Sequence, residues 1–229
     1  MRNFICIVTS ALVIFGCAKR GNPSGGPIDS IPPVLVNANP KLNSTNFDSD
    51  EIRLTFDEWV KLENIQDQLI ISPPIDKSSY EITPLSGVTK KVFLRFLDSL
   101  NPKTTYTINF GNSIQDNNEN NPLTFFSYTF STGETIDSLF IMGNIRDAFD
   151  QETDDYISLQ LYRVDSLFKD SIIYSDKPTY ISNTLDSTNY KFQNLKEGKY
   201  LIIAMKDVDN NYFFDPFYDH IGFIDSLIT

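Results

Sequence analysis

The sequence predicts an all-β protein built from two tandem β-sandwiches of Greek-key topology. The chain has 229 residues, which is enough for two domains of the commonest size. It contains 18 Phe and 11 Tyr against 10 Gly and 3 Met, and aromatic residues are enriched in strands. From Val34 onward, short runs of apolar residues recur at every second position, and no comparable run has a helical period. An all-α fold is therefore disfavoured.

The first 16 residues have the features of a cleaved signal peptide. Arg2 gives a weakly positive start, and residues 4–15 are mostly apolar but too few to span a bilayer. The end of this segment, Ile14-Phe15-Gly16-Cys17, resembles the lipobox of bacterial lipoproteins. That resemblance implies cleavage after residue 16 and attachment of fatty acyl chains such as palmitate to Cys17. The alternatives are an ordinary signal peptide that ends near a cysteine, or a buried N-terminal helix.

Residues 17–29 predict a lipidated tether, because they are rich in Gly, Pro and Ser and lack periodicity. Two or more acyl chains hold a protein stably at a membrane, so the anchor replaces a transmembrane helix. Ala18 carries no acidic inner-membrane retention signal, which favours the outer membrane. Lys19 and Arg20 stand where surface-exported Bacteroidetes lipoproteins carry an acidic run, so the resemblance favours the periplasmic face over the cell surface. Cys6 would be discarded with the signal peptide, and no disulfide is expected.

Residues 30–133 predict the first sandwich. Alternating apolar residues occupy four stretches, at 52–56, 92–96, 106–110 and 126–130. Turn-forming residues separate these stretches, as in a Greek-key sandwich. We expect Trp59, the single tryptophan, to pack in the core or at its rim rather than to serve as a sugar platform.

The segments IPPVLVNANPKLNSTNF, IRLTFDEWV and LNPKTTYTINFGNSIQDNNENNPLTFFSYTFSTG resemble the bacterial Ig-like domain of the SbsA type. The shared pattern opens with a Pro-Pro strand and closes with an Asp-Asn-rich turn and a Phe-Ser-Thr strand. The resemblance implies an Ig-like fold that serves as a spacer or cohesive module.

Residues 134–229 predict the second sandwich. Alternation at 141–145 and 157–161 indicates two strands, and YKFQNLKEGKYLIIAMK predicts a hairpin with a tight reversal at Gly198. The last segment resembles the YxFxNLxxGxYxIxA signature of the carboxypeptidase-regulatory-like, transthyretin-like β-sandwich, a non-catalytic module. Together with the lipobox, the two modules resemble Bacteroidetes Ig-like lipoproteins.

Charge and composition disfavour nucleic-acid binding and catalysis. The formal charge is −11, and no stretch collects enough Lys and Arg to follow a phosphate backbone. His220 is the only histidine, and the sequence contains neither HExxH nor GxSxG. We expect His220 to be a surface or interface residue near the start of a strand, and no catalytic residue is predicted.

One acidic segment has partial calcium-loop spacing. Asp207, Asp209, Asn211 and Asp215 stand at positions 1, 3, 5 and 9, where alternate oxygens can face one cation. Tyr212 replaces the glycine of an EF-hand, and no Glu stands at position 12. The alternative is a polar turn after a strand. Calcium is the only cofactor that the sequence suggests.

Eight Asp-Ser pairs occur in the sequence, and seven continue with Ile, Leu or Thr. These triplets resemble the acceptor pattern of periplasmic O-glycosylation in Bacteroidetes. Asp-Ser is also a favoured dipeptide at strand ends, and the two interpretations stay open. The seven serines are Ser30, Ser99, Ser138, Ser166, Ser171, Ser187 and Ser226.

The sequence therefore predicts a non-enzymatic outer-membrane lipoprotein that acts as a structural or binding module. Its expected partners are the membrane, through the lipid, and a protein or glycan of the envelope. The alternative is an accessory glycan- or nutrient-binding lipoprotein of an uptake system, and a hydrolase comes third. A flat exposed aromatic platform would favour glycan binding, whereas buried rings would favour an interface between the sandwiches. The rings in question are Tyr212, Phe213, Phe214, Phe217 and Tyr218.

Overall fold

A computed structural model describes residues 26–148, 156–184 and 188–229. The expected signal peptide, Cys17 and Ser187 lie outside these residues. The all-β prediction is confirmed, because the described chain forms several antiparallel sheets of an Ig-like sandwich architecture. Its helical segments are short, namely α2 (Ile65–Gln68) and the 3-10 turns η2 (Lys77–Ser79) and η3 (Asp170–Tyr174). No helix among the described residues is both long and apolar enough to cross a membrane.

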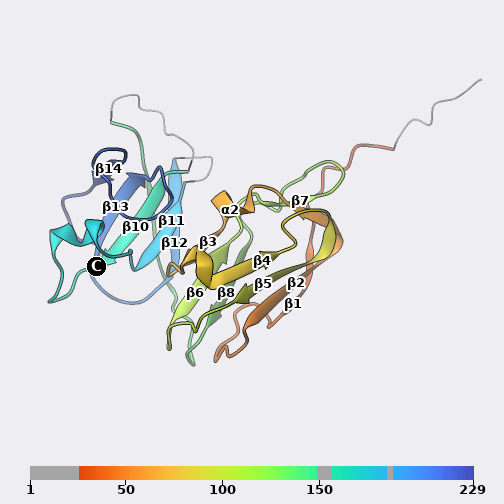
Figure 1. The fold of residues 1–229 in the computed structure, drawn as a ribbon, viewed down its shortest axis with the longest axis horizontal. Helices are drawn as coiled ribbons and strands as arrows, with labels where there is room; N and C mark the ends of the chain where they lie inside the picture. The colour runs from red at the N-terminus through yellow and green to blue at the C-terminus, as the bar shows by residue number, and fades with distance from the viewer. Residues whose placement is uncertain (1–25, 149–155, 185–187) are drawn as a thin grey trace, which may run out of the picture.

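Two sheets form the first sandwich (Figure 1). One sheet has the order β1-β2-β5-β4 with β7 paired to β2, and the other has the order β3-β6-β8. The strands are β1 (Leu35–Asn39), β2 (Glu51–Leu62), β3 (Ile70–Ser72), β4 (Tyr80–Thr83), β5 (Thr89–Phe96), β6 (Thr105–Asn109), β7 (Ile114–Asp116) and β8 (Ser127–Ser131).

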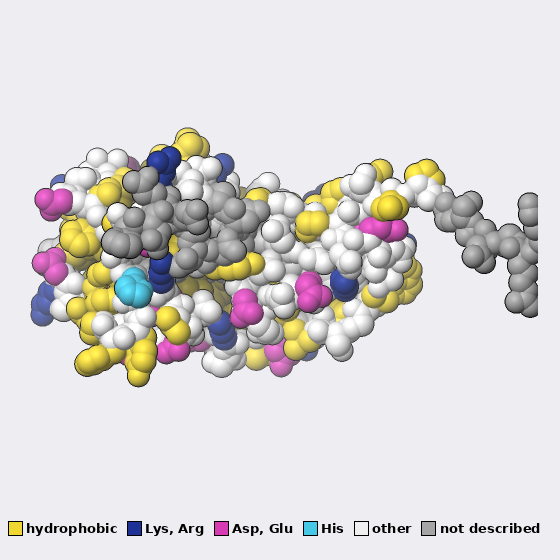
Figure 2. All heavy atoms as spheres, turned by 90° about the horizontal axis from the view of Figure 1, so that it is seen from above, with side chains coloured by type: hydrophobic (Ala, Val, Ile, Leu, Met, Phe, Trp, Pro, Cys, Tyr) yellow, Lys and Arg dark blue, Asp and Glu magenta, His cyan; other side chains and the backbone are white. Residues whose placement is uncertain are grey.

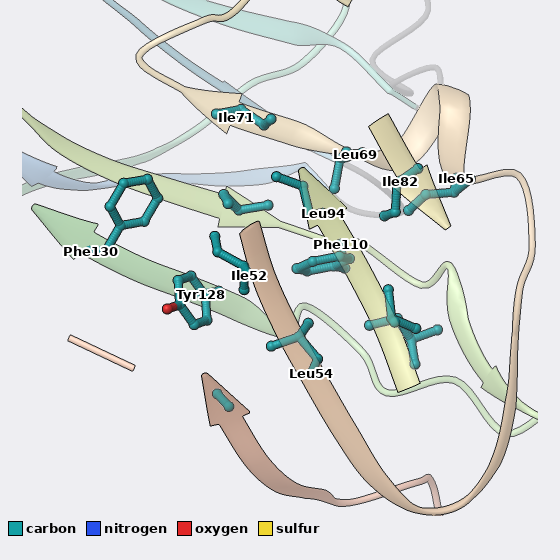
Figure 3. Close-up of a cluster of buried hydrophobic side chains, with 14 of the residues drawn as sticks. Ile52, Leu54, Ile65, Leu69, Ile71, Ile82, Leu94, Phe110, Tyr128 and Phe130 are labelled. Carbon is teal, nitrogen blue, oxygen red and sulfur yellow. The ribbon is translucent and has the colours of Figure 1, made fainter. Parts of the chain in front are cut away.

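The core of the first sandwich lies between these sheets (Figure 3), and the ring of Phe130 packs against several other aromatic rings in it. Its ring centroid is 4.1 Å from that of Phe47 and 5.4 Å from that of Tyr106. Tyr128 is fully buried, and its hydroxyl donates a hydrogen bond to the Pro40 carbonyl at 2.8 Å. Burial raises the pKa of Tyr128 to about 12, so the hydroxyl remains a donor. The predicted alternation in this half of the chain is thus confirmed.

The Asp-Asn-rich turn after β7 is organised by one buried carboxylate. Asp116 accepts hydrogen bonds from the backbone amides of Asn118, Glu119, Asn120 and Asn121, at 2.7 to 3.0 Å. Burial by itself would raise the pKa of Asp116, but these amide hydrogen bonds together hold it below its ordinary value. Asp116 therefore stays ionised and fixes the turn that brings Pro122 back to β7.

Trp59 does not lie where the sequence predicted it. Its side chain is 55% exposed on β2, so the prediction of core or rim packing is wrong. The alternation of residues 52–56 keeps the same phase as far as Val60, so Trp59 lies on the outer face of β2 together with Arg53. Val60, rather than Trp59, is the next buried residue.

We predict that Asp116→Ala lowers the free energy of unfolding of the first sandwich by about 2 to 4 kcal/mol, because several buried amides lose a charged acceptor. Urea unfolding followed by Trp59 fluorescence measures this, since the single tryptophan lies in the first sandwich. Glu119→Ala, in the same turn but exposed, is the matched control and should have little effect.

The stabilisation by Asp116 should also depend on pH. A carboxyl whose pKa is lowered on folding stabilises the protein above its unfolded pKa and loses this effect as pH falls through the folded pKa. The difference between wild type and Asp116→Ala should therefore shrink below about pH 4. A difference that stays constant down to about pH 2 would contradict the ionised role of Asp116.

Two unequal sheets form the second sandwich. One has the order β11-β10-β13-β14, and the other consists, within the described residues, of β12 and β9. The strands are β9 (Leu139–Asn144), β10 (Ser158–Arg163), β11 (Tyr180–Asn183), β12 (Asn189–Leu195), β13 (Tyr200–Lys206) and β14 (His220–Phe223). Leu159, Leu161 and Ile202 face the core between the sheets. On the opposite face of the larger sheet, Tyr162 and Ile203 form a second buried cluster.

The predicted hairpin between β12 and β13 is wrong. β12 pairs with β9, whereas β13 pairs with β10 and β14, so the chain crosses from one sheet to the other at Gly198. Gly198 does not have a positive φ. A Cβ there would lie 3.2 Å from the Tyr200 hydroxyl, so the glycine makes room for this ring. Tyr200 in turn donates a hydrogen bond to the Lys196 carbonyl at 2.9 Å.

The two sandwiches contact each other along β3 and β11 (Figure 1). The Ile181 amide donates to the Ser72 hydroxyl at 3.1 Å, and Lys177 forms an ion pair with Asp76. Close to the connection, the Thr105 hydroxyl donates to Asp137 at 2.8 Å. Directional hydrogen bonds thus join the sandwiches along a largely polar seam.

Candidate functional site

The predicted calcium ligands lie in the loop between β13 and β14, and most of their oxygens face the loop backbone. The carboxylate of Asp207 accepts hydrogen bonds from the amides of Asn211 and Tyr212, at 3.2 and 2.8 Å. The Asn211 side chain accepts from the Phe213 amide at 2.7 Å, and Asp215 accepts from the Phe217 amide at 2.9 Å. Asp209 is exposed.

Asp219, which the sequence analysis did not single out, closes this loop. It is buried, and its carboxylate accepts from the Val208 amide at 3.0 Å and from the Asp215 amide at 2.8 Å. The pKa of the neighbouring Asp207 lies above its ordinary value, mainly because the side chain is buried and also because the charge of Asp219 is close. The hydrogen bonds from the loop amides oppose this rise. The acidic residues thus serve as acceptors that fold the loop.

The structure does not gather the predicted ligands around one point. In the part of the chain that the structure describes, no three or more His, Cys, Asp or Glu side chains form a group that could hold a metal ion. Calcium binding stays a prediction, and it would require carboxylates to exchange backbone amides for the ion. A rise in the melting temperature in millimolar calcium that Asp209→Ala removes would support it.

The aromatic residues of this loop differ in exposure. Phe214 packs against the buried cluster of Tyr162 and Ile203, and its amide donates to the Ile173 carbonyl at 2.9 Å. Burial first, and then the nearby Tyr80 of the first sandwich, raise the pKa of Tyr212 to about 12. Phe213 is half-buried, whereas Phe217 and Tyr218 are 89% and 69% exposed. The five rings therefore do not form one exposed platform.

We predict that Asp219→Ala lowers the free energy of unfolding of the second sandwich by about 1 to 3 kcal/mol, because two loop amides lose their acceptor. Asp209→Ala is the matched control in the same loop, and it should change this quantity by less than about 0.5 kcal/mol. Urea unfolding followed by tyrosine near-ultraviolet circular dichroism measures both variants. Equal effects of the two substitutions would contradict the closing role of Asp219.

A hollow of about 420 Å³ opens in the second sandwich, between the end of β9 and the inner face of β13 and β14. Its floor is formed by Leu159, Ala204 and Gly222, which are cross-strand neighbours on β10, β13 and β14. A Cβ at Gly222 would find no heavy atom within 4 Å. Ile145 and Tyr190 line the opposite side. The hollow thus exists because two small residues, Ala204 and Gly222, lie side by side in an apolar part of the sheet.

Charged and polar side chains line one end of the hollow. Lys206 lies 3.3 Å from Asp147 in an ion pair, and Arg146 and His220 lie beside them. Figure 2 shows the single histidine at the surface, with basic and hydrophobic side chains next to it. His220 is exposed at the first residue of β14, as the sequence predicted. The hollow combines an apolar floor with a rim that carries two basic residues and one acidic residue.

The residue pattern of the sequence did not predict this hollow. Ala204 and Gly222 are 18 positions apart, and only the register between β13 and β14 brings them side by side. The feature of the sequence that points to it is Gly222 in the segment HIGF. A glycine weakens a strand, and it often marks a site where a ligand or another backbone approaches closely.

The serines of the Asp-Ser triplets are accessible wherever the structure describes them. Ser30, Ser99, Ser138, Ser166, Ser171 and Ser226 are all exposed and lie outside strands. This position fits both a modified serine and a strand-end dipeptide.

Comparisons with known proteins support the Ig-like half of the chain. Residues 29–132 match the family model of the bacterial Ig-like domain. The chain is also similar to the crystal structure of the N-terminal part of the bacterial S-layer protein SbsC, with 12% identity and a TM-score of 0.26. That match covers 81% of this chain and 44% of that chain, so the chain spans less than half of its length. A search of curated proteins finds no match. An Ig-like β-sandwich fits a structural or binding module and is typically non-catalytic.

Proposed function

We propose that the chain is a non-enzymatic lipoprotein, held in the outer membrane by acyl chains on Cys17 and facing the periplasm. Its two sandwiches, Ig-like and then transthyretin-like, act there as a structural or binding module. The observation that carries the proposal is the placement of the two sandwiches relative to the N-terminal segment. The first described residues leave the first sandwich near β7, at the end away from the second sandwich (Figure 1).

This placement has a consequence for binding. An anchor upstream of residue 26 attaches at one end of the molecule, and the seam along β3 and β11 holds the second sandwich at the other end. The second sandwich therefore projects away from the membrane and presents its hollow to the periplasm. Binding fits the second sandwich, and spacing fits the first.

Glycan or nutrient binding is the second candidate function, and the exposed Phe217 and Tyr218 favour it. Exposed aromatic rings can stack on sugar faces. Phe214 and Tyr212 are occupied by packing, however, so any platform is limited to two of the five rings. The structural or binding role is therefore the better supported of the two.

We predict that Cys17→Ala abolishes metabolic labelling with a fatty acid and moves the protein from the membrane fraction to the soluble fraction, because the acyl chains are its only anchor in this proposal. Cys6→Ala is the matched control, since Cys6 would be removed with the signal peptide. Fractionation and labelling of both variants in the native host measure the effect. Membrane retention of Cys17→Ala would contradict the proposal.

We propose further that exposed serines of the Asp-Ser triplets carry glycans. The intact mass of protein isolated from its native envelope should then exceed the sum of polypeptide and lipid. Replacing Ser138 by Ala should lower the mass by one glycan in addition to the serine oxygen. Ser49→Ala is the control, because Ser49 belongs to the one Asp-Ser pair without a following Ile, Leu or Thr, and it should lower the mass only by the serine oxygen. A mass that polypeptide and lipid fully explain would exclude glycosylation.

A further inference from the structure

The described part of the second sandwich lacks a strand at a defined position. Its larger sheet has four strands, but the facing sheet has only β12 and β9. The Ser182 hydroxyl of β11 donates to the Lys191 carbonyl of β12 at 2.8 Å, which places β12 at the β11 side. β9 follows β12, and within the described chain no strand faces β14. The hollow over Ala204 and Gly222 is the space that a third strand beside β9 would cover.

The open edge of β9 presents unpaired main-chain groups to this space. The Ile145 amide donates to the Thr188 carbonyl at 2.8 Å, so the main-chain groups of Ile145 and, two residues earlier, Gly143 point toward β12. Because this direction alternates along an antiparallel strand, the groups of Met142 and Asn144 point away from β12. Among the described residues, β9 pairs with β12 alone. The edge can therefore accept a further strand.

The side chains beside this edge are apolar and exposed. Phe140 and Met142 lie on the outer face of β9 and are 59% and 62% exposed. On the inner face, Ile141 and Ile145 pack against the core. A strand added to β9 would contact the exposed pair through its outward side chains and would fill the hollow through its inward ones. An exposed apolar edge of this kind is a typical site of strand addition.

We propose that this open edge binds one extended strand of another protein, which pairs with β9 and places alternate apolar side chains over Ala204 and Gly222. The rim specifies one further feature of that strand. Among the described residues at one end of the hollow, Lys206 is paired with Asp147 and Arg146 adds one further positive charge, although the whole chain has a charge of −11. An acidic residue at that end of the strand complements this rim.

Two other occupants fit less well. A second copy that offered its own β9 would bring its own β14 into the same space, because β14 extends beyond β9 in each copy. A small apolar ligand would fill the hollow but would leave the Met142 and Asn144 main-chain groups without partners. A single strand fills the hollow and pairs the edge at once. The strand is the partner in the binding role proposed above, and its assignment rests on that role. The Cys17→Ala experiment tests the membrane anchor separately.

The test adds a strand to the full chain. A strand of alternating Val and Thr that ends in Glu, about seven residues long, is joined to Thr229 through a Gly/Ser linker of about 20 residues. Such a linker gives an effective concentration in the millimolar range and permits either strand direction. Hydrogen exchange of the Met142 and Asn144 amides should slow by about tenfold or more. The control carries Asn in place of each Val and should give no protection.

Three variants of the tethered protein separate strand addition from other occupancy. Met142→Pro removes an amide that points to the open edge, where proline is tolerated, and should abolish protection of Asn144. Met142→Thr keeps the amide and should retain the protection. Gly222→Leu adds a side chain to the floor of the hollow, where a Cβ meets no heavy atom within 4 Å, and should abolish the protection. The near-ultraviolet circular dichroism of the variant checks that the sandwich stays folded.

Three results would overturn the inference. The first is equal exchange rates with the Val/Thr strand and the Asn control. The second is protection that survives both Met142→Pro and Gly222→Leu. The third is protection of β9 in the chain without an added strand that rises with protein concentration, which would identify a second copy as the occupant.

Discussion

Strand β13 is apolar on both of its faces, and the second sandwich is arranged around the need to cover them. Ile202 and Tyr200 face the core between the sheets, whereas Ile203 faces the opposite side. A sheet with two apolar faces must have two covers, because exposed apolar area of this extent is unfavourable in water. One cover is the small sheet of β9 and β12. The other consists of two irregular segments, the region around η3 and the loop between β13 and β14.

The acidic composition of that loop follows from this requirement. An irregular segment that covers a sheet buries part of its own backbone, and its amides need acceptors. Asp207 and Asp219 supply them, and this allows Phe214 to lie on the buried cluster. Asp116 has the same role in the Asn-rich turn of the first sandwich. In both loops, buried carboxylates accept hydrogen bonds from the backbone amides of the loop.

Strand positions could be predicted from the sequence, but strand partners could not. Alternation fixes which face of a strand is buried, as for Ile52 and Leu54 or Leu159 and Leu161, because burial depends on the side chains of that strand alone. Pairing depends on which sheet a strand joins, and β12 and β13 satisfy the same alternation in opposite sheets. The register that aligns Ala204 with Gly222 is likewise a relation between strands. The exposure of Trp59, in contrast, follows from the alternation that buries Ile52 and Leu54 on the same strand. The floor of the hollow could therefore not be predicted from residue patterns, although the unusual position of Gly222 within a strand could be recognised.

The two sandwiches differ in how completely their described strands enclose a core, and this difference supports the roles proposed for them. In the first, described sheets of five and three strands enclose an aromatic core around Phe130, and the edge strand β3 is engaged in the seam with β11. In the second, a two-stranded sheet faces a four-stranded one, and the uncovered area lies over β14 rather than next to the seam. A Cβ at Gly222 would meet no heavy atom within 4 Å, so the close packing of neighbours does not explain the glycine. An uncovered apolar floor beside an unpaired strand edge is a standing risk of non-specific association. The second sandwich lies at the end of the molecule away from the N-terminal segment, where a partner can approach freely (Figure 1). This placement supports the proposal that the first sandwich acts as a spacer and the second binds.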